Sequence, residues 1–387
     1  MKERAIAVLG SGNGGLNFAG DLTLAGHEVR LFELPQFKGS LQPVLDAGGI
    51  ELEGLCRTGF AKPAVITTDI GEALQGADVV LVAVPAYGHG EFARICAPHL
   101  SSGQIVVLNP GYTLGAIEFS NLLIREGADI DVTICETISL LYATRKYVPN
   151  RVFCEGVKVD MPIAAFPSER TESALEILDP IYRQDDGKRG RLFPLDNVLL
   201  AALTNGNPVL HVPMMLLKAV DVELGEEPYW KCKDSTAIKL MRRDLDREMI
   251  RLQIALGFEP LSHIYVHDTL MYPSWAPVID TTDPECDADL PEWVQPKNQP
   301  GLYAAGQGHN FLQMRYLTED IPYALVGMSN LGELLNVPTP VIDAAITLAS
   351  TVTGEDYWQT GRTLRELGMA HFSKEELLRY VTTGRAR

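Results

Sequence analysis

The chain has 387 residues and a formal net charge of −17, with 46% hydrophobic and 21% charged residues. This length suggests two domains, because single domains usually contain about 100–200 residues. The acidic balance argues against a nucleic-acid-binding protein, and the short basic cluster at residues 188–191 is more typical of a solvated loop. No apolar run approaches the roughly 18–20 residues that span a bilayer. Without a recognisable signal peptide, we expect a cytoplasmic protein that binds no membrane.

The six cysteines are scattered and form no C-x-x-C pair, which favours reduced, mostly buried thiols. His263 and His267 lie four residues apart beside Asp268, a spacing that resembles a pair of metal ligands. Two unrelated histidines are the favoured interpretation. We therefore predict no metal site.

The first thirty-odd residues have the pattern of one βαβ unit. Residues 4–9 form a short apolar run, which is typical of a parallel strand covered on both faces. Residues 14–25 carry apolar side chains at helical spacing, and Gly26 is a good helix terminator. Residues 27–33 return to strand character. The unit has the length expected of a strand, a crossover helix and a second strand.

Strands and helices continue to alternate beyond this unit. The pattern predicts strands at 64–67, 78–84, 104–108 and 131–135, helices at 69–74, 90–100, 116–125 and 172–182, and further strands within 151–194. Such alternation predicts an α/β domain with a Rossmann-type, doubly wound parallel sheet.

The strand signal fades after about residue 194, and a second, mostly α-helical domain is predicted. Helical periodicity covers residues 196–220, 235–256, 321–335 and 340–352. The polar, glycine-containing turn at 186–190 separates the two patterns, so we expect domains at 1–188 and 189–387. Residues 273–310 are rich in Pro, Asp and Gly, which suggests a functional loop or lid.

The turn after the first strand is a G-x-G-x-x-G motif in the context that dinucleotide binding requires. Gly10 permits the tight turn, Gly12 allows close approach of a pyrophosphate, and Gly15 allows close packing of helix and strand. A carboxylate at Glu33 suits the ribose hydroxyls and repels a 2′-phosphate, so NAD (as NADH) is favoured over NADP, although Lys38 lies nearby. The cofactor-binding residues predicted here are Gly10, Gly12, Asn13, Gly14, Gly15 and Glu33.

Further candidate residues follow the predicted strands. In such sheets the ligand lies outside the carboxyl ends of the strands. Plain turn chemistry explains these residues equally well. The segments concerned are Pro85-Ala86, Asn109-Pro110-Gly111 and Glu136-Thr137.

A dehydrogenase needs an acid/base near neutral pH, and histidine is the usual choice. Of eight histidines, His211 stands out because it follows a helical run at the start of the second domain. Arg315 and Asp320 form a second candidate cluster. Arg315 can hold a substrate carboxylate and Asp320 can orient His211, while the structural alternatives are a surface arginine and a helix N-cap.

These segments together resemble the opine dehydrogenases, the octopine/nopaline dehydrogenase family. The resemblance extends from Ile6 to about Leu367. Its histidine and arginine segments are much more specific than the glycine turn. The segments that carry it are residues 8–15, 108–119, 136–137, 204–211, 315–320 and 336–343.

The resemblance implies a Rossmann domain joined to a helical domain, and NADH-dependent condensation of an L-amino acid with a 2-oxo acid, often pyruvate. The imine would be reduced to an N-(1-carboxyalkyl) amino acid. By the same resemblance His211 is the general acid/base, Asp320 its partner and Arg315 the carboxylate clamp. The remaining substrate contacts are expected from Tyr112, Glu136 and Thr137.

The sequence departs from the family pattern at Tyr112-Thr113-Leu114, where smaller residues are common, and in the loop 273–309, which does not align. The expected partners are small-molecule substrates, with a homodimer left open. Two alternatives also remain open: a hydroxyacid or ketopantoate-type reductase, which would use a lysine such as Lys218 or Lys239, and a non-catalytic NAD-binding protein.

Overall fold

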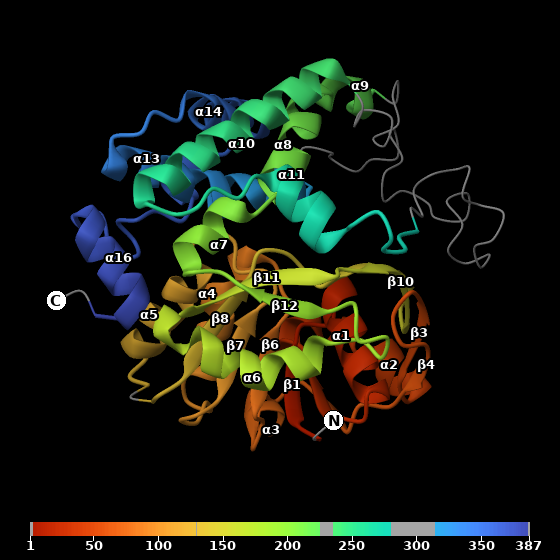
Figure 1. Ribbon diagram of the computed structural model, residues 1–387. Helices are drawn as coiled ribbons and strands as arrows, with labels where there is room; N and C mark the ends of the chain where they lie inside the picture. The colour runs from red at the N-terminus through yellow and green to blue at the C-terminus, as the bar shows by residue number, and fades with distance from the viewer. Residues whose placement is uncertain (1–2, 129, 225–234, 280–313, 386–387) are drawn as a thin grey trace.

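The computed structural model describes residues 3–128, 130–224, 235–279 and 314–385 (Figure 1). The part of the chain outside these ranges includes most of the loop predicted at 273–310. The first residues of that loop, 273–279, are described. They contact the strand segment 151–157, where Ile279 N–H donates to the Glu155 carbonyl at 2.7 Å. No helix in the described ranges is long and apolar enough to cross a membrane.

The first domain is built on an eight-stranded sheet with the order β12-β11-β8-β7-β6-β1-β2-β5. Neighbouring strands are parallel except β11 and β8, which are antiparallel. The central strands are entirely buried, as their continuous apolar sequences require. The strands are β1 (Ala5–Leu9), β2 (Glu28–Phe32), β5 (Val65–Thr67), β6 (Val79–Val82), β7 (Ile105–Leu108), β8 (Thr133–Thr137), β11 (Asp160–Phe166) and β12 (Arg191–Pro194).

The direction of winding reverses between β1 and β6, which places the ends of these two strands at a switch point. From β1 the chain moves through α1 to β2, whereas from β6 it moves through α4 and α5 toward β8. Right-handed crossovers therefore put α1 on one face and α4 and α5 on the other. Ligands of such sheets bind at this point. The helices are α1 (Asn13–Leu24), α3 (Ile70–Leu74), α4 (His89–Cys96), α5 (Gly115–Arg125) and α6 (Thr171–Tyr182).

A second sheet of four strands packs against α1 and was not predicted. Its order is β4-β3-β10-β9, and β3 pairs in parallel with β10, about one hundred residues further along the chain. The segment before β3 holds η1 (Pro35–Ser40) and α2 (Gln42–Ala47). The strands are β3 (Ile50–Gly54), β4 (Gly59–Ala61), β9 (Tyr142–Val148) and β10 (Arg151–Val157).

The second domain is helical, as predicted, and lies above the edge of the large sheet in Figure 1. Its longest helix, α10, contacts α7, α8, α13 and α14 and forms the centre of the bundle. The helices are α7 (Val198–Thr204), α8 (Asn207–Leu217), α9 (Ala219–Glu223), α10 (Thr236–Leu256), α11 (His263–Tyr265), η5 (Val266–Met271), α12 (Arg315–Thr318), η9 (Ile321–Leu325), α13 (Val326–Leu335), α14 (Pro340–Thr353) and α15 (Tyr357–Thr360).

Three features differ from the sequence-based expectations. The helix expected at 196–220 is broken at Asn205-Gly206, where α7 ends and α8 begins with Pro208 in its first turn. Strand β12 extends the sheet to Pro194, past the boundary expected at 188/189. The C-terminal helix α16 (Lys374–Thr383) returns to the first domain and contacts β11 and the 3-10 turn η3 (Ser168–Arg170).

Candidate active site between the two domains

The glycine turn has the geometry that a bound dinucleotide needs. Gly10 has φ +106°, and a Cβ at Gly15 would lie 1.8 Å from the Gly10 carbonyl oxygen. By contrast, a Cβ at Gly12 would meet nothing within 4 Å, so this glycine borders open space. No side chain caps the first turn of α1. Its N–H groups and helix dipole therefore suit a pyrophosphate at this position.

Asn13 and Gly14 make contacts that their place in the motif did not reveal. Asn13 Oδ1 accepts a hydrogen bond from Lys146 N–H on β9 at 3.0 Å. A Cβ at Gly14 would lie 2.8 Å from Leu140 Cδ1. Asn13 therefore binds β9, and the absence of a side chain at Gly14 lets Leu140 pack against the glycine turn. The cofactor contacts expected of both residues stay predictions.

Glu33 lies at the carboxyl end of β2, where a ribose-binding acid is expected. Its side chain is held on both oxygens: Oε2 accepts from Ser11 N–H at 2.7 Å and Ser11 Oγ at 2.8 Å, and Oε1 accepts from Leu34 N–H at 2.9 Å. The glycine turn thus orients this carboxylate directly.

The predicted residues Pro85 and Ala86 follow β6 and begin a short 3-10 turn, η2 (Ala86–Gly88). Ala86 N–H donates to Glu319 Oε1 of the helical domain at 2.6 Å. This bond connects the two domains where the nicotinamide half of a dinucleotide would lie. Sequence reasoning quoted Glu319 as part of a motif but gave it no role.

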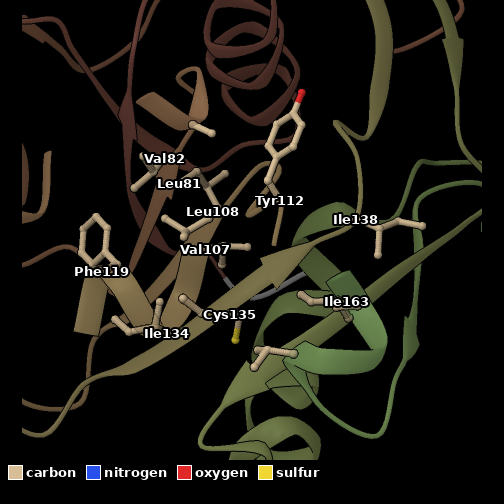
Figure 2. Close-up of a cluster of buried hydrophobic side chains, with 14 of the residues drawn as sticks. Leu81, Val82, Val107, Leu108, Tyr112, Phe119, Ile134, Cys135, Ile138 and Ile163 are labelled. Carbon is tan, nitrogen blue, oxygen red and sulfur yellow. The ribbon is translucent and has the colours of Figure 1, made fainter. Parts of the chain in front are cut away.

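The turn after β7 brings Tyr112 to the strand ends. The Asn109–Pro110 bond is cis, Asn109 Oδ1 accepts from Tyr182 Oη at 2.8 Å, and Gly111 N–H donates to the Thr137 carbonyl at 3.1 Å. Tyr112 itself has φ 59°. Figure 2 shows its ring rising from the buried side chains of β6, β7 and β8, with the hydroxyl pointing away from them.

Glu136 and Thr137 are both buried, and their side chains bind neighbouring groups of the protein. Glu136 is 1% exposed and lies beneath Gly111, with Oε2 accepting from Ala116 N–H at 2.7 Å. The Thr137 hydroxyl donates to the Ser139 carbonyl at 2.8 Å. The expectation that these two residues contact substrate stays a prediction.

The environment of Glu136 favours its neutral form. Burial raises the pKa of this carboxyl to about 8, although the Ala116 N–H and the nearby Arg362 oppose the shift. Oε1 is buried without a hydrogen-bond partner. A protonated Glu136 supports the turn without placing an unpaired charge in the core.

His211 and Asp320 come together as predicted, although 109 residues separate them. His211 Nδ1 lies 2.8 Å from Asp320 Oδ2, and the His211 ring stacks on Tyr316 with centroids 4.0 Å apart. The aspartate side chain is 1% exposed and the histidine 22%. With Nδ1 directed at the carboxylate, Nε2 is the nitrogen left to exchange a proton with a ligand.

Arg315 and Tyr112 lie beside this pair. The Arg315 side chain is 59% exposed, and its Nη1 is 3.7 Å from Glu319 Oε2. The Tyr112 hydroxyl is 3.5 Å from Asn207 Nδ2, one turn before His211 on α8. Burial raises the pKa of Glu319, while Arg315 and the Ala86 N–H oppose that shift. The cluster therefore brings together an exposed guanidinium, a phenol and an imidazole.

Sequence reasoning missed Arg362, which organises the turn that carries Tyr112. The residue is 3% exposed. Its Nη1 donates to the Gly111 and Thr113 carbonyls at 3.2 and 3.0 Å. Nη2 donates to Glu118 Oε2 at 2.5 Å. The arginine lies in an irregular segment after α15, so no periodicity could have identified it.

His263, one of the two histidines considered for metal binding, packs against the helical domain's helix α8. A Cβ at Gly206 would lie 2.8 Å from His263 Cδ2, so α11 packs closely against the start of α8. Burial lowers the pKa of His263 to about 4, helped by His267 and Arg242. Within the ranges that the structure covers, no three His, Cys, Asp or Glu side chains form a metal-binding group.

Comparison with known proteins assigns both halves of this arrangement. Residues 5–129 match the model of the NAD-dependent glycerol-3-phosphate dehydrogenase N-terminus. Residues 194–353 match that of the NAD/NADP octopine/nopaline dehydrogenase α-helical domain. An opine dehydrogenase of Arthrobacter sp. (strain 1C) is 34% identical over 371 residues, which covers 96% of each chain. The chain belongs to the opine dehydrogenase family.

Solved opine dehydrogenases share the whole fold. An octopine dehydrogenase with NADH and pyruvate superposes with a TM-score of 0.70 at 20% identity, covering 98% of both chains. A yersinopine dehydrogenase with bound NADP⁺ gives 0.67 at 16% identity, with the same coverage. The chain is thus an NAD(P)-dependent oxidoreductase of the opine dehydrogenase type, which acts on CH–NH donors.

Proposed function

We propose that this opine dehydrogenase condenses an L-amino acid with a 2-oxo acid such as pyruvate and reduces the resulting imine with NADH. The observation that carries the proposal is the His211–Asp320 pair at 2.8 Å, with Arg315 beside it. The neighbouring Glu319 binds Ala86 N–H after β6, the strand next to β1 and its glycine turn. This site combines a proton donor with a carboxylate-binding cation, and imine formation between two carboxylate-bearing substrates needs both.

Each side chain has a role that follows from its setting. Arg315 binds the carboxylate of the oxo acid, since its guanidinium is accessible and can make two parallel hydrogen bonds. His211 exchanges protons with the reacting nitrogen and with the oxygen that leaves as water, and the Asp320 carboxylate orients its imidazole ring. Tyr112 borders the same space. Glu136 and Arg362 position the turn that carries Tyr112.

NADH supplies the hydride when bound, and the residues of the glycine turn fit this cofactor. Gly12 borders open space, the first turn of α1 is uncapped, and Glu33 is fixed at the end of β2. A fixed carboxylate favours free ribose hydroxyls over a 2′-phosphate, so NADH is the preferred cofactor.

The relatives support the substrate class. Octopine dehydrogenase has been solved with NADH together with pyruvate, L-arginine or agmatine. More distant curated relatives include a vitopine synthase and a tauropine dehydrogenase, so the amine varies within the family. We therefore propose an amino acid as the amine without assigning its side chain.

The test is NADH oxidation with pyruvate, with and without a panel of L-amino acids that includes arginine, lysine, phenylalanine and small aliphatic residues. Oxidation that requires both substrates, with the N-(1-carboxyethyl) amino acid detected by mass spectrometry, is the expected result. Oxidation with the oxo acid alone would favour a hydroxyacid reductase. Tight NADH binding without turnover across other oxo acids as well would favour a non-catalytic role.

A further inference from the structure

Lys146 on β9 brings a positive charge from the second sheet to the glycine turn. Its Nζ donates to the Ser11 carbonyl at 3.2 Å, and its backbone N–H donates to Asn13 Oδ1 at 3.0 Å. The side chain is partly buried. The lysine is therefore held at the start of α1 from two directions, although nothing in the sequence motif includes it.

A hollow opens beside this lysine. Its volume is about 290 Å³, and it is lined by Gly39, Ser40, Pro43, Lys146, Tyr147, Val148 and Pro149. Ser40 Oγ is hydrogen-bonded to Ser11 Oγ, which donates to Glu33 Oε2 at 2.8 Å. The hollow thus adjoins the residues that fix the ribose-binding acid. Whole-ligand pockets usually measure about 300–1,000 Å³, so this volume suits one substituent of a larger ligand.

The ammonium at this hollow suits a phosphate. It has three protons to donate, and the Ser11 carbonyl accepts one of them. The Ser40 hydroxyl donates its own proton to the Phe37 carbonyl at 2.9 Å, so Lys146 is the phosphate donor here. Burial lowers the pKa of Lys146, while the negative charge of Glu33 opposes that shift, so the two side chains are electrostatically coupled. A phosphate placed here would meet an ammonium that offsets the repulsion from Glu33.

We propose that Lys146 binds the 2′-phosphate of NADPH, so that this enzyme accepts NADPH as a second cofactor beside the preferred NADH. The inference rests on the proposed dinucleotide site but assigns to it a residue from the second sheet. In this arrangement Glu33 favours binding of the free ribose hydroxyls. Lys146 attracts the 2′-phosphate and so offsets its repulsion by Glu33. The adenosine end of the site therefore discriminates only moderately between the two cofactors.

The experiment is a fluorescence titration of NADH and of NADPH, without substrates, on the wild type and on the Lys146→Met, Lys146→Arg and Lys38→Met variants. Lys38 is the matched control, because it is an exposed lysine on η1, the turn that also carries Ser40. Lys146→Met should raise the Kd for NADPH about tenfold or more, the size of a lost charge-assisted hydrogen bond, and change the Kd for NADH less than threefold. Lys146→Arg should retain most of the NADPH affinity.

Retained NADH binding by Lys146→Met shows that the variant is folded. Three results would overturn the inference: no NADPH binding by a wild type that binds NADH, an equal loss of both cofactors in Lys146→Met, or a selective loss in Lys38→Met instead. The equal loss would point to a diphosphate contact. Failure of the wild type to bind either dinucleotide would refute the proposed function together with this inference.

Discussion

Replacing Asp320 by asparagine removes the charge that faces His211 while conserving the size of the side chain. The carboxylate is 2.8 Å from His211 Nδ1 and almost wholly buried, so water screens this pair little. A hydrogen bond to a charged group contributes about 1.5–3 kcal/mol, and each 1.4 kcal/mol changes a rate tenfold. Because the charge-assisted bond holds the His211 ring in place for proton transfer, Asp320→Asn should lower the single-turnover rate about 10- to 150-fold.

The assay is single-turnover NADH oxidation at saturating substrates, with NADH affinity and thermal unfolding measured in parallel. The Kd for NADH should change less than twofold, because Asp320 lies in the helical domain, away from the glycine turn. Glu248→Gln is the matched control: this carboxylate is also buried in the helical domain, and it accepts from Val341 and Ile342 N–H. A rate for Asp320→Asn within threefold of the wild type would refute the role assigned to the pair.

Three further changes probe the cofactor turn and its support. Gly12→Ala should keep the melting temperature of the wild type and weaken NADH binding at least tenfold in a fluorescence titration. Gly15→Ala should lower the melting temperature, because its Cβ would overlap the Gly10 carbonyl oxygen. Equal stability of the two variants would contradict this. The folded-state pKa of Glu136, about 8, lies above its unfolded value, so its stabilisation is complete below about pH 4.3 and is lost as pH rises toward 8. Urea unfolding should therefore show a wild-type stability that falls over this range relative to Glu136→Gln, and parallel curves would disprove the assignment. Arg362→Ala should cost about 3–5 kcal/mol in the same unfolding measurement, since it leaves buried acceptors and a carboxylate unpaired; a loss below 1 kcal/mol would show that water replaces the guanidinium.

The parts of the molecule that the sequence predicted are those in which the signal is local. The first strand, the glycine turn, α1 and the acid at the end of β2 lie within thirty residues, and each constrains the next. The helix expected at 69–74 is present, and Asp69 caps it by accepting from Gly71 and Glu72 N–H. The pairing of His211 with Asp320 was expected from the chemistry that a dehydrogenase needs and from the family resemblance, because no local pattern relates residues so far apart.

The parts that sequence reasoning missed depend on contacts between distant segments. Strand β3 alternates apolar residues with glutamates, but nothing local in the sequence indicates that it pairs with β10, about one hundred residues later. The burial of Glu136 beneath Gly111 depends on which face of β8 it occupies, and one residue of register decides that face. Arg362 acts through carbonyl groups some 250 residues earlier in the chain. Only the assembled fold shows why these residues matter.

The return of α16 to the first domain makes the helical domain an insertion between two parts of the Rossmann fold. Both the entering helix α7 and the returning helix α16 contact β11. The chain therefore enters and leaves the helical domain beside the same strand. Exchange of helical domains between relatives would require two junctions, one ahead of α7 and one ahead of α16. A chain cut after α15 would lose part of the covering of β11.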